Sequence, residues 1–187
     1  MTSPVKLAHV VLQTTDVARL RDWWTTVLDA EVIWQNDGLC FLSYDDEHHR
    51  LAIAAPPGVT GPVDKSVAGL HHVAFTYEGL DQLVGVYERL KAAGIDPTLC
   101  INHGPTLSFY FEDPDGNSAE LQVDCFAEPD AATAFMNGPY FAKNPIGFRV
   151  DPDDLARRLH DGEPVESLLV RRDVARDRAD AASAQLS

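Results

Sequence analysis

The chain contains little cysteine and little positive charge. Its three cysteines, Cys40, Cys100 and Cys125, are odd in number and widely spaced, and no two have the spacing of a metal-binding or redox pair. We therefore expect reduced, mostly buried thiols in a cytoplasmic protein. The 15 Lys and Arg residues face 29 Asp and Glu residues, which gives a formal charge of −14. This balance predicts no nucleic-acid partner and no anionic membrane partner, because both favour basic surfaces.

Long apolar segments are also lacking. No apolar run approaches the roughly 20 residues that span a membrane. The first six residues, MTSPVK, contain no apolar signal segment. With 187 residues, the chain should form one domain, or one domain with a tail, and bury a sizeable core.

The chain does contain a short sequence motif that occurs twice. LAHVVL at residues 7–12 and LHHVAF at residues 70–75 are each followed by a helical pattern. An internal repeat of this kind predicts that the chain contains two modules with the same order of helices and strands. It places His9 and His72 at equivalent strand positions. Because strand neighbours point to opposite faces and Ala8 aligns with His71, His72 should be oriented like His9.

The pattern around the two phrases predicts two βαβββ modules. In the first, Thr15 or Asp16 caps the helix, and Asn36-Asp37-Gly38 forms a hairpin turn. The predicted strands of this module cover residues 6–13, 31–35, 39–44 and 50–54. The second module has a helix at residues 80–93 and strands at residues 70–76, 98–102, 107–112 and 118–123. An Asp-Pro-Asp-Gly-Asn turn precedes its last strand.

These elements predict an α+β fold in which the two modules pair in one chain and form a barrel-like metal-binding cleft. Residues 1–126 make up this domain, with module one at 5–55, a Pro- and Gly-rich linker at 56–68 and module two at 69–126. Residues 127–187 form a partly helical C-terminal extension, with a helix starting near Asp151-Pro152. Beyond Glu163, the dense charge predicts a short or frayed helix with little chemical function.

A carboxylate completes a candidate metal site. Glu120 interrupts an apolar strand in which Ala119, Leu121 and Val123 share the opposite parity. Those three residues should pack in the core, so Glu120 should face the cleft, although an outward position on an amphipathic strand is the alternative. His9, His72 and Glu120 then form a 2-His-1-carboxylate set, which suits non-haem Fe(II) chemistry with oxygen.

Three further residues are candidates for catalysis. His49 lies in His48-His49-Arg50 at the start of a strand, although the preceding acidic residues are also typical of a solvated turn. His103 lies in a polar loop at a strand end, where catalytic groups often occur. Tyr110 lies on the following strand, where a buried tyrosine is also common in ordinary cores.

With these residues, the chain resembles the vicinal oxygen chelate superfamily over residues 6–126. This superfamily includes glyoxalase I, epimerases, resistance proteins and type I extradiol dioxygenases. Three stretches resemble the small single-domain extradiol enzymes, which are similar to 2,3-dihydroxybiphenyl 1,2-dioxygenase and catechol 2,3-dioxygenase. They are HHRLA at residues 48–52, NHGPTLSFY at residues 102–110 and DPDGN at residues 113–117, which leads to Glu120. The NPIG segment at residues 144–147 is also similar to this group.

The resemblance implies a role for each candidate residue. His9, His72 and Glu120 would hold Fe(II), although Mn(II) binds similar sites. His49 would sit by dioxygen and exchange protons. Tyr110 would hydrogen-bond the substrate-side oxygen, and His103 would lie near a catecholate hydroxyl. The implied reaction is extradiol cleavage of an aromatic diol, with both atoms of O2 inserted into the product, as in aromatic hydrocarbon catabolism.

The sequence fits two other functions of this superfamily less well. Glyoxalases and epimerases commonly take a fourth metal ligand from the last strand of module one, but RLAIAA at residues 50–55 offers none. Metal-free binding proteins lack the ligand set altogether. In the tail, the aromatic residues between 135 and 148 are expected to border the site entrance or to form a homodimer contact, which favours a dimer. Packing of these residues on their own domain is the alternative.

Overall fold

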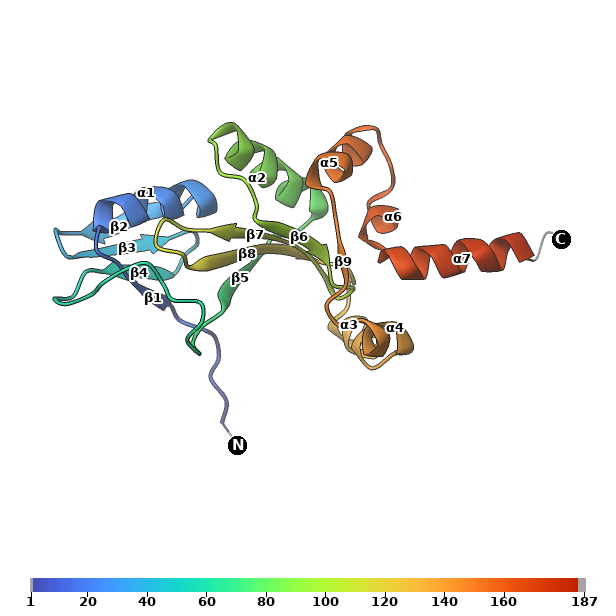
Figure 1. The fold of residues 1–187 in the computed structure, drawn as a ribbon, viewed down its shortest axis with the longest axis horizontal. Helices are drawn as coiled ribbons and strands as arrows, with labels where there is room; N and C mark the ends of the chain where they lie inside the picture. Colours follow the sequence, from blue (N-terminus) through green and yellow to red (C-terminus); the bar gives the residue numbers. More distant parts are fainter. Residues whose placement is uncertain (1, 185–187) are drawn as a thin grey trace. The chain divides into compact units, whose positions relative to one another are not determined.

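The computed structural model describes residues 2–184, with side chains through residue 180. It contains two mixed or antiparallel sheets and their helices, so the predicted α+β class is confirmed (Figure 1). The chain forms two compact units. Unit 1 comprises Met1–His71 and Glu112–Ser118, and unit 2 comprises His72–Phe111 and Ala119–Ser187.

Unit 1 contains a four-stranded sheet in the order β1-β4-β3-β2, with helix α1 (Val17–Leu28) packed against it. The strands are β1 (Val10–Gln13), β2 (Glu31–Gln35), β3 (Leu39–Ser43) and β4 (Leu51–Ala54). β1 runs parallel to β4, with Val10 opposite Leu51. Asp16 caps the helix, as predicted, because its carboxylate accepts from the Arg19 amide at 3.0 Å. The apolar face of α1 is buried through Leu20, Trp24 and Val27.

The Asp-Pro-Asp-Gly-Asn turn belongs to unit 1 and carries two buried carboxylates. Asp113 accepts from the indole Nε1 of Trp24 at 3.0 Å and from the side-chain amide of Asn117 at 2.8 Å. Asp115 accepts from the hydroxyl of Thr14 at 2.5 Å and pairs with Arg19. The turn therefore does more than reverse the chain, because it satisfies polar groups from the first module.

This network predicts a large stability effect. We expect Asp113→Ala to lower the free energy of unfolding by about 2–4 kcal/mol, because each buried donor left unpaired costs roughly 1–3 kcal/mol. Urea denaturation would measure the loss. Asp37→Ala, in the exposed β2–β3 turn, is the matched control and should change little. Equal stability of the two variants would show that the Asp113 network contributes nothing.

Unit 2 contains a five-stranded sheet in the order β5-β8-β7-β6-β9. Its strands are β5 (His72–Thr76), β6 (Leu99–Asn102), β7 (Thr106–Glu112), β8 (Ser118–Asp124) and β9 (Phe148–Arg149). Helix α2 (Leu80–Ala92) buries Leu83, Tyr87 and Leu90, and Gly94 follows it at a φ of +76°. That left-handed position fits the predicted glycine C-cap.

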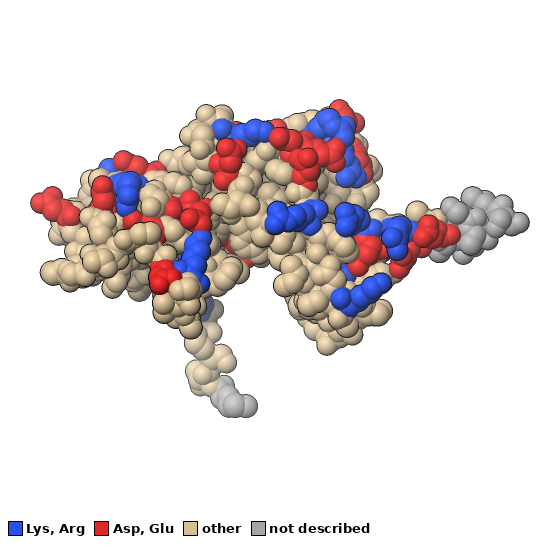
Figure 2. All heavy atoms as spheres, in the orientation of Figure 1, with Lys and Arg blue, Asp and Glu red and all other residues tan. Residues whose placement is uncertain are grey.

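Over the residues described, five helices lie after β8 in unit 2, and β9 comes between the second and the third of them. They are α3 (Pro129–Met136), α4 (Pro139–Lys143), α5 (Pro152–His160), α6 (Val165–Leu169) and α7 (Arg172–Ala184). Asp151 caps α5 through the amides of Asp153 and Asp154. Acidic and basic side chains are interspersed over α5 and α7 (Figure 2), as the ion pair between Arg157 and Asp161 illustrates.

Some expectations on this architecture need correction. β1 begins at Val10 rather than at residue 6, and β5 begins at His72 rather than at residue 70, because the preceding residues are exposed. β9 was not predicted, and it pairs with β6 through Asn102 and Phe148. Over the residues described, each sheet by itself is open, and the barrel-like cleft that the two modules should form together stays a prediction. Beyond Glu163 the chain forms α6 and α7 over the residues described, rather than one short or frayed helix.

The cysteines are free thiols, as expected. Cys40 and Cys100 are buried, and burial raises the pKa of Cys100 and of Cys125 to about 12. Among the residues described, no helix has the length and apolar character needed to cross a membrane.

Candidate metal centre

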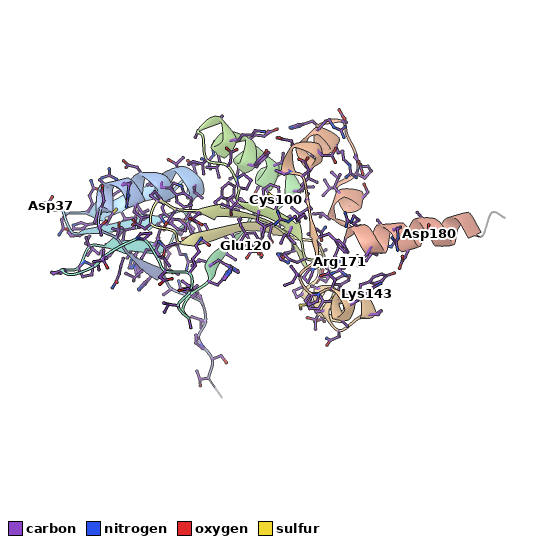
Figure 3. All side chains as sticks on the ribbon, viewed as in Figure 1. Asp37, Cys100, Glu120, Lys143, Arg171 and Asp180 are labelled. Carbon is purple, nitrogen blue, oxygen red and sulfur yellow. The ribbon has the colours of Figure 1, made fainter. Side chains whose placement is uncertain are left out.

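Glu120 is a buried carboxylate in the middle of β8. Its neighbours Ala119 and Leu121 are fully buried, and Glu120 itself is only 5% exposed. Its Oε2 lies 2.8 Å from Nε2 of His72. A buried carboxylate is costly unless it is paired or bound to a metal. Glu120 and His72 therefore present an oxygen and a nitrogen donor side by side (Figure 3 labels Glu120).

His72 is the first residue of β5, which is the neighbour of β8 in the sheet. Its side chain is one-third exposed, whereas His71 precedes the strand and is exposed. The structure therefore brings His72, rather than His71, into contact with Glu120.

Tyr110 and His103 lie next to this pair. The ring of Tyr110 meets the ring of His72 edge-on, with 5.5 Å between centroids, and its hydroxyl lies 3.0 Å from Nε2 of His103. Burial, the charge of Glu120 and a hydrogen bond to Glu120 together raise the pKa of Tyr110 far above its ordinary value. The phenol therefore stays protonated at neutral pH and can donate a hydrogen bond.

The other predicted histidines lie in unit 1. His9 immediately precedes β1, and its ring lies 4.4 Å from that of His49. The His49 ring also stacks on Phe41 at 4.7 Å, and its Nδ1 lies 2.6 Å from Nδ1 of His48. Burial, followed by the neighbouring His9 and His48, lowers the pKa of His49. The description as a solvated turn thus fits His48, whose side chain is 70% exposed, better than His49.

The predicted ligand set is divided between the units, since His9 belongs to unit 1 and His72 and Glu120 belong to unit 2. Neither unit by itself gathers three or more described His, Cys, Asp or Glu side chains into a group that could hold a metal ion. The donor chemistry of the His72–Glu120 pair nevertheless fits a divalent ion, because imidazole nitrogen and carboxylate oxygen are the donors of the facial triad of non-haem iron.

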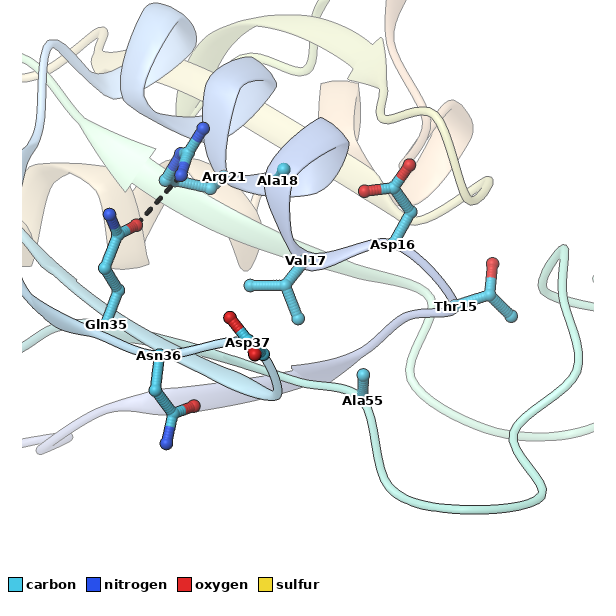
Figure 4. A pocket seen from close by; sticks show the side chains of 9 residues that line it. All are labelled: Thr15, Asp16, Val17, Ala18, Arg21, Gln35, Asn36, Asp37 and Ala55. Atoms are coloured by element: carbon cyan, nitrogen blue, oxygen red, sulfur yellow. Dashed lines mark hydrogen bonds between the residues drawn. The ribbon is translucent and has the colours of Figure 1, made fainter.

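A hollow in unit 1 does not involve any of these residues. It measures about 620 Å³ and lies between the start of α1 and the β2–β3 turn (Figure 4). Arg21 and Gln35 both line it, and Nη1 of Arg21 donates to Oε1 of Gln35 at 2.9 Å. The hollow is lined by Asp16 and Asp37 among others, and no predicted site residue borders it.

One residue near the site was missed from the sequence. Arg171 is 2% exposed and donates to the carbonyl of His103 at 3.2 Å and to that of Asn144 at 2.9 Å. Its guanidinium carbon lies 5.1 Å from the centroid of the Phe135 ring. Nothing in the sequence distinguishes this arginine from the solvated arginines that follow it in the tail.

The aromatic residues of the tail pack largely within unit 2. Phe135 contacts Phe126 and Phe141, with ring centroids 5.5 and 6.3 Å apart. Phe148 lies beneath the guanidinium groups of Arg171 and Arg172. For these phenylalanines the alternative of packing on their own domain therefore holds, and the site-entrance and dimer roles remain predictions.

The sequence also matches a family model described as Glyoxalase/Bleomycin resistance protein/Dioxygenase superfamily, over residues 6–121. The chain belongs to this superfamily. The predicted membership is confirmed, and it covers both modules of the repeat. A domain of this superfamily from Frankia sp. EAN1pec has the same fold, with a TM-score of 0.55 and 24% identity over 67% of this chain and 96% of that chain.

Two relatives of the chain come from Rhodococcus globerulus. Biphenyl-2,3-diol 1,2-dioxygenase 2 is 48% identical over 168 residues, which cover 90% of this chain and 88% of the relative. Biphenyl-2,3-diol 1,2-dioxygenase 3 is 41% identical over 172 residues, which cover 91% and 90%. Both alignments are long enough to extend beyond residue 126. The predicted likeness to extradiol dioxygenases is therefore confirmed.

Proposed function

We propose that the protein is an extradiol ring-cleavage dioxygenase that inserts both atoms of O2 into a catechol-type aromatic diol. The observation that carries the proposal is the buried His72–Glu120 pair, with Tyr110 and His103 placed beside it. The long alignments with biphenyl-2,3-diol 1,2-dioxygenases support the reaction class and favour an aryl-substituted diol as substrate.

His9, His72 and Glu120 are the proposed ligands of Fe(II), and Mn(II) is the alternative ion. The repeat supports His9 and His72, and the buried, paired carboxylate supports Glu120. When bound, the ion supplies a redox-active centre that accepts a diol and dioxygen. Two neutral imidazoles and one carboxylate would neutralise only one of the two positive charges of such an ion. The positive charge that is left would suit an anionic substrate, and a second carboxylate in place of a histidine would remove it.

The chain's own residues would handle protons and orient the substrate. His49 is the proposed base, because its lowered pKa leaves the imidazole neutral and able to accept a proton at neutral pH. Tyr110 would donate to a substrate oxygen, since its raised pKa keeps the hydroxyl protonated. His103 would contact a hydroxyl of the diol through Nε2, which already faces the Tyr110 hydroxyl.

The assembly of the enzyme is part of the same proposal. Residues 1–126 would form the catalytic domain, with modules at 5–55 and 69–126 joined by the linker at 56–68 and paired in a barrel-like cleft. Residues 127–187 would form the extension. A cytoplasmic homodimer is the expected form.

A glyoxalase- or epimerase-like reaction is less well supported. β4 of module one consists of Leu51, Ala52, Ile53 and Ala54, and it offers no side chain that could act as a fourth ligand. The positions left open on the metal favour a diol together with dioxygen.

A diol panel tests the proposal. The full chain is loaded with Fe(II) under anaerobic conditions and then mixed in air with 2,3-dihydroxybiphenyl, catechol and a monohydroxylated biphenyl. We expect a yellow ring-cleavage product from the diols and none from the monohydroxylated control. Iron-loaded protein that leaves every diol unchanged would overturn the proposal.

A further inference from the structure

The two ring nitrogens of His103 have different partners. Nδ1 lies 2.5 Å from the backbone carbonyl of Ile146, and Nε2 lies 3.0 Å from the hydroxyl of Tyr110. A carbonyl oxygen can only accept a hydrogen bond, so Nδ1 must carry a proton. In the neutral imidazole, Nε2 is then the unprotonated nitrogen and an acceptor, and the single proton of the Tyr110 hydroxyl is shared as a donor between Nε2 and the carboxylate of Glu120.

We propose that the C-terminal segment at residues 135–173 is a positioning element for His103. The carbonyl of Ile146 selects the imidazole tautomer that is protonated at Nδ1, and Asn144 and Arg171 hold that carbonyl in place. His103 thus presents Nε2 as an acceptor. The inference rests on the proposed function only where it assigns Nε2 to the substrate.

Asn144 holds the peptide unit that contains the Ile146 carbonyl. The amide of Gly147 belongs to this peptide and donates to Oδ1 of Asn144 at 3.0 Å. Nδ2 of Asn144 donates in turn to the carbonyl of Gly147 at 2.9 Å. The first bond holds the peptide from the side opposite to the Ile146 carbonyl, and the second holds the peptide unit that follows it, so the carbonyl keeps its direction toward His103.

Gly147 allows the close approach of the two segments. Its φ is +94°, and a Cβ at this position would overlap the backbone carbonyl of Asn102 and the Cα of His103. Only glycine tolerates both conditions. The β6–β9 pairing continues the contact, with Asn102 opposite Phe148.

Arg171 ties the tail and the His103 loop together from the other side. Its guanidinium donates to the carbonyls of His103, Asn144 and Tyr140, the last at 2.7 Å. Asp173 neutralises the buried charge at 2.8 Å. Because the guanidinium is planar and rigid, these bonds constrain the positions of three backbone segments at once.

Packing of the tail on its domain does not by itself require the polar contact between the Ile146 carbonyl and His103. Packing of Phe135 or Phe148 would be served by any apolar surface. The Ile146 side chain is 65% exposed, and it is the backbone carbonyl of this residue that meets His103. The contact is therefore polar and directional, and its effect on His103 is a choice between two tautomers.

The tautomer can be measured directly. In full-length protein with 15N-labelled histidine, loaded with diamagnetic Zn(II), the His103 signals are assigned by comparison with His103→Gln. We expect Nδ1 to have the shift of a protonated nitrogen and Nε2 that of an unprotonated nitrogen. In Asn144→Ala, both shifts should move toward intermediate values as the tautomers interconvert. Asn137→Ala, which removes a side-chain bond to Thr133 in the same extension, is the matched control and should leave them unchanged.

Kinetics with iron-loaded protein and 2,3-dihydroxybiphenyl give the second readout. Loss of one orienting hydrogen bond should lower kcat of Asn144→Ala about 3- to 10-fold, with KM changed less than about 2-fold. Arg171→Lys keeps the buried charge but loses the planar fork, and it should act in the same direction.

A wild-type His103 that is protonated at Nε2, or an Asn144→Ala variant with wild-type shifts, would overturn the inference. If the wild-type protein cleaves no diol, the proposed function fails, but the nitrogen shifts still decide whether the tail selects the tautomer.

Discussion

Glu120→Ala and His72→Ala are expected to lose bound iron and to lower kcat/KM by more than about 100-fold. Replacing a residue that only supports a metal ligand costs roughly 10–100-fold, so loss of a ligand should cost more. The proposal rests on the pairing of these two side chains, because Nε2 of His72 and Oε2 of Glu120 lie 2.8 Å apart beside Tyr110. Iron content after desalting and steady-state kinetics on a diol are the measurements.

Two controls separate this effect from a general loss of structure. His71→Ala changes the adjacent exposed histidine, and Glu112→Ala changes an exposed carboxylate on the neighbouring strand β7. Both variants should retain iron and activity. Glu120→Gln keeps the volume of the side chain and should still lose iron. Loss of iron in His71→Ala with full retention in His72→Ala would show that the wrong histidine was assigned.

His49→Phe is expected to retain iron but to lower kcat about 10²- to 10⁴-fold, which is the usual contribution of proton transfer by a positioned side chain. The neighbouring ring of Phe41 can accommodate an aromatic replacement, since it stacks on His49 at 4.7 Å. Burial and the nearby His9 and His48 lower the pKa of His49, so the imidazole is neutral and able to accept a proton at neutral pH.

His48→Ala is the control for His49, because its side chain is 70% exposed and adjacent in sequence. It should reduce kcat only slightly. A His49→Phe enzyme with wild-type kcat, or one that has lost its iron, would contradict the assignment of His49 as a base.

The regular elements were predictable because hydrophobic periodicity determines them. The two βαβββ patterns, the Asp16 cap and the Gly94 C-cap all depend on residues that are close in sequence. The same is true of the alternation of strand faces, which points Glu120 away from Ala119 and Leu121 although all three residues are buried. Strand ends were less accurate, since β1 begins only at Val10, after a segment that stays exposed.

Features that depend on distant residues could not be predicted. Assignment of the 112–118 turn to unit 1 depends on Trp24, Thr14 and Arg19, which lie about 90 to 100 positions earlier in the chain. β9 is too short to give a periodic signal. Arg171 was missed because its partners are backbone carbonyls, which carry no sequence information.

The central claim is that a 2-His-1-carboxylate centre in this chain cleaves an aromatic diol with dioxygen. The most direct test is a reaction of anaerobically iron-loaded protein with 2,3-dihydroxybiphenyl under ¹⁸O2, with oxygen uptake recorded alongside. We predict uptake of one O2 per diol, a yellow ring-opened product and ¹⁸O in its new carboxylate. Iron-loaded protein that takes up no oxygen, or whose ring-opened product carries no ¹⁸O from the gas, would contradict the account.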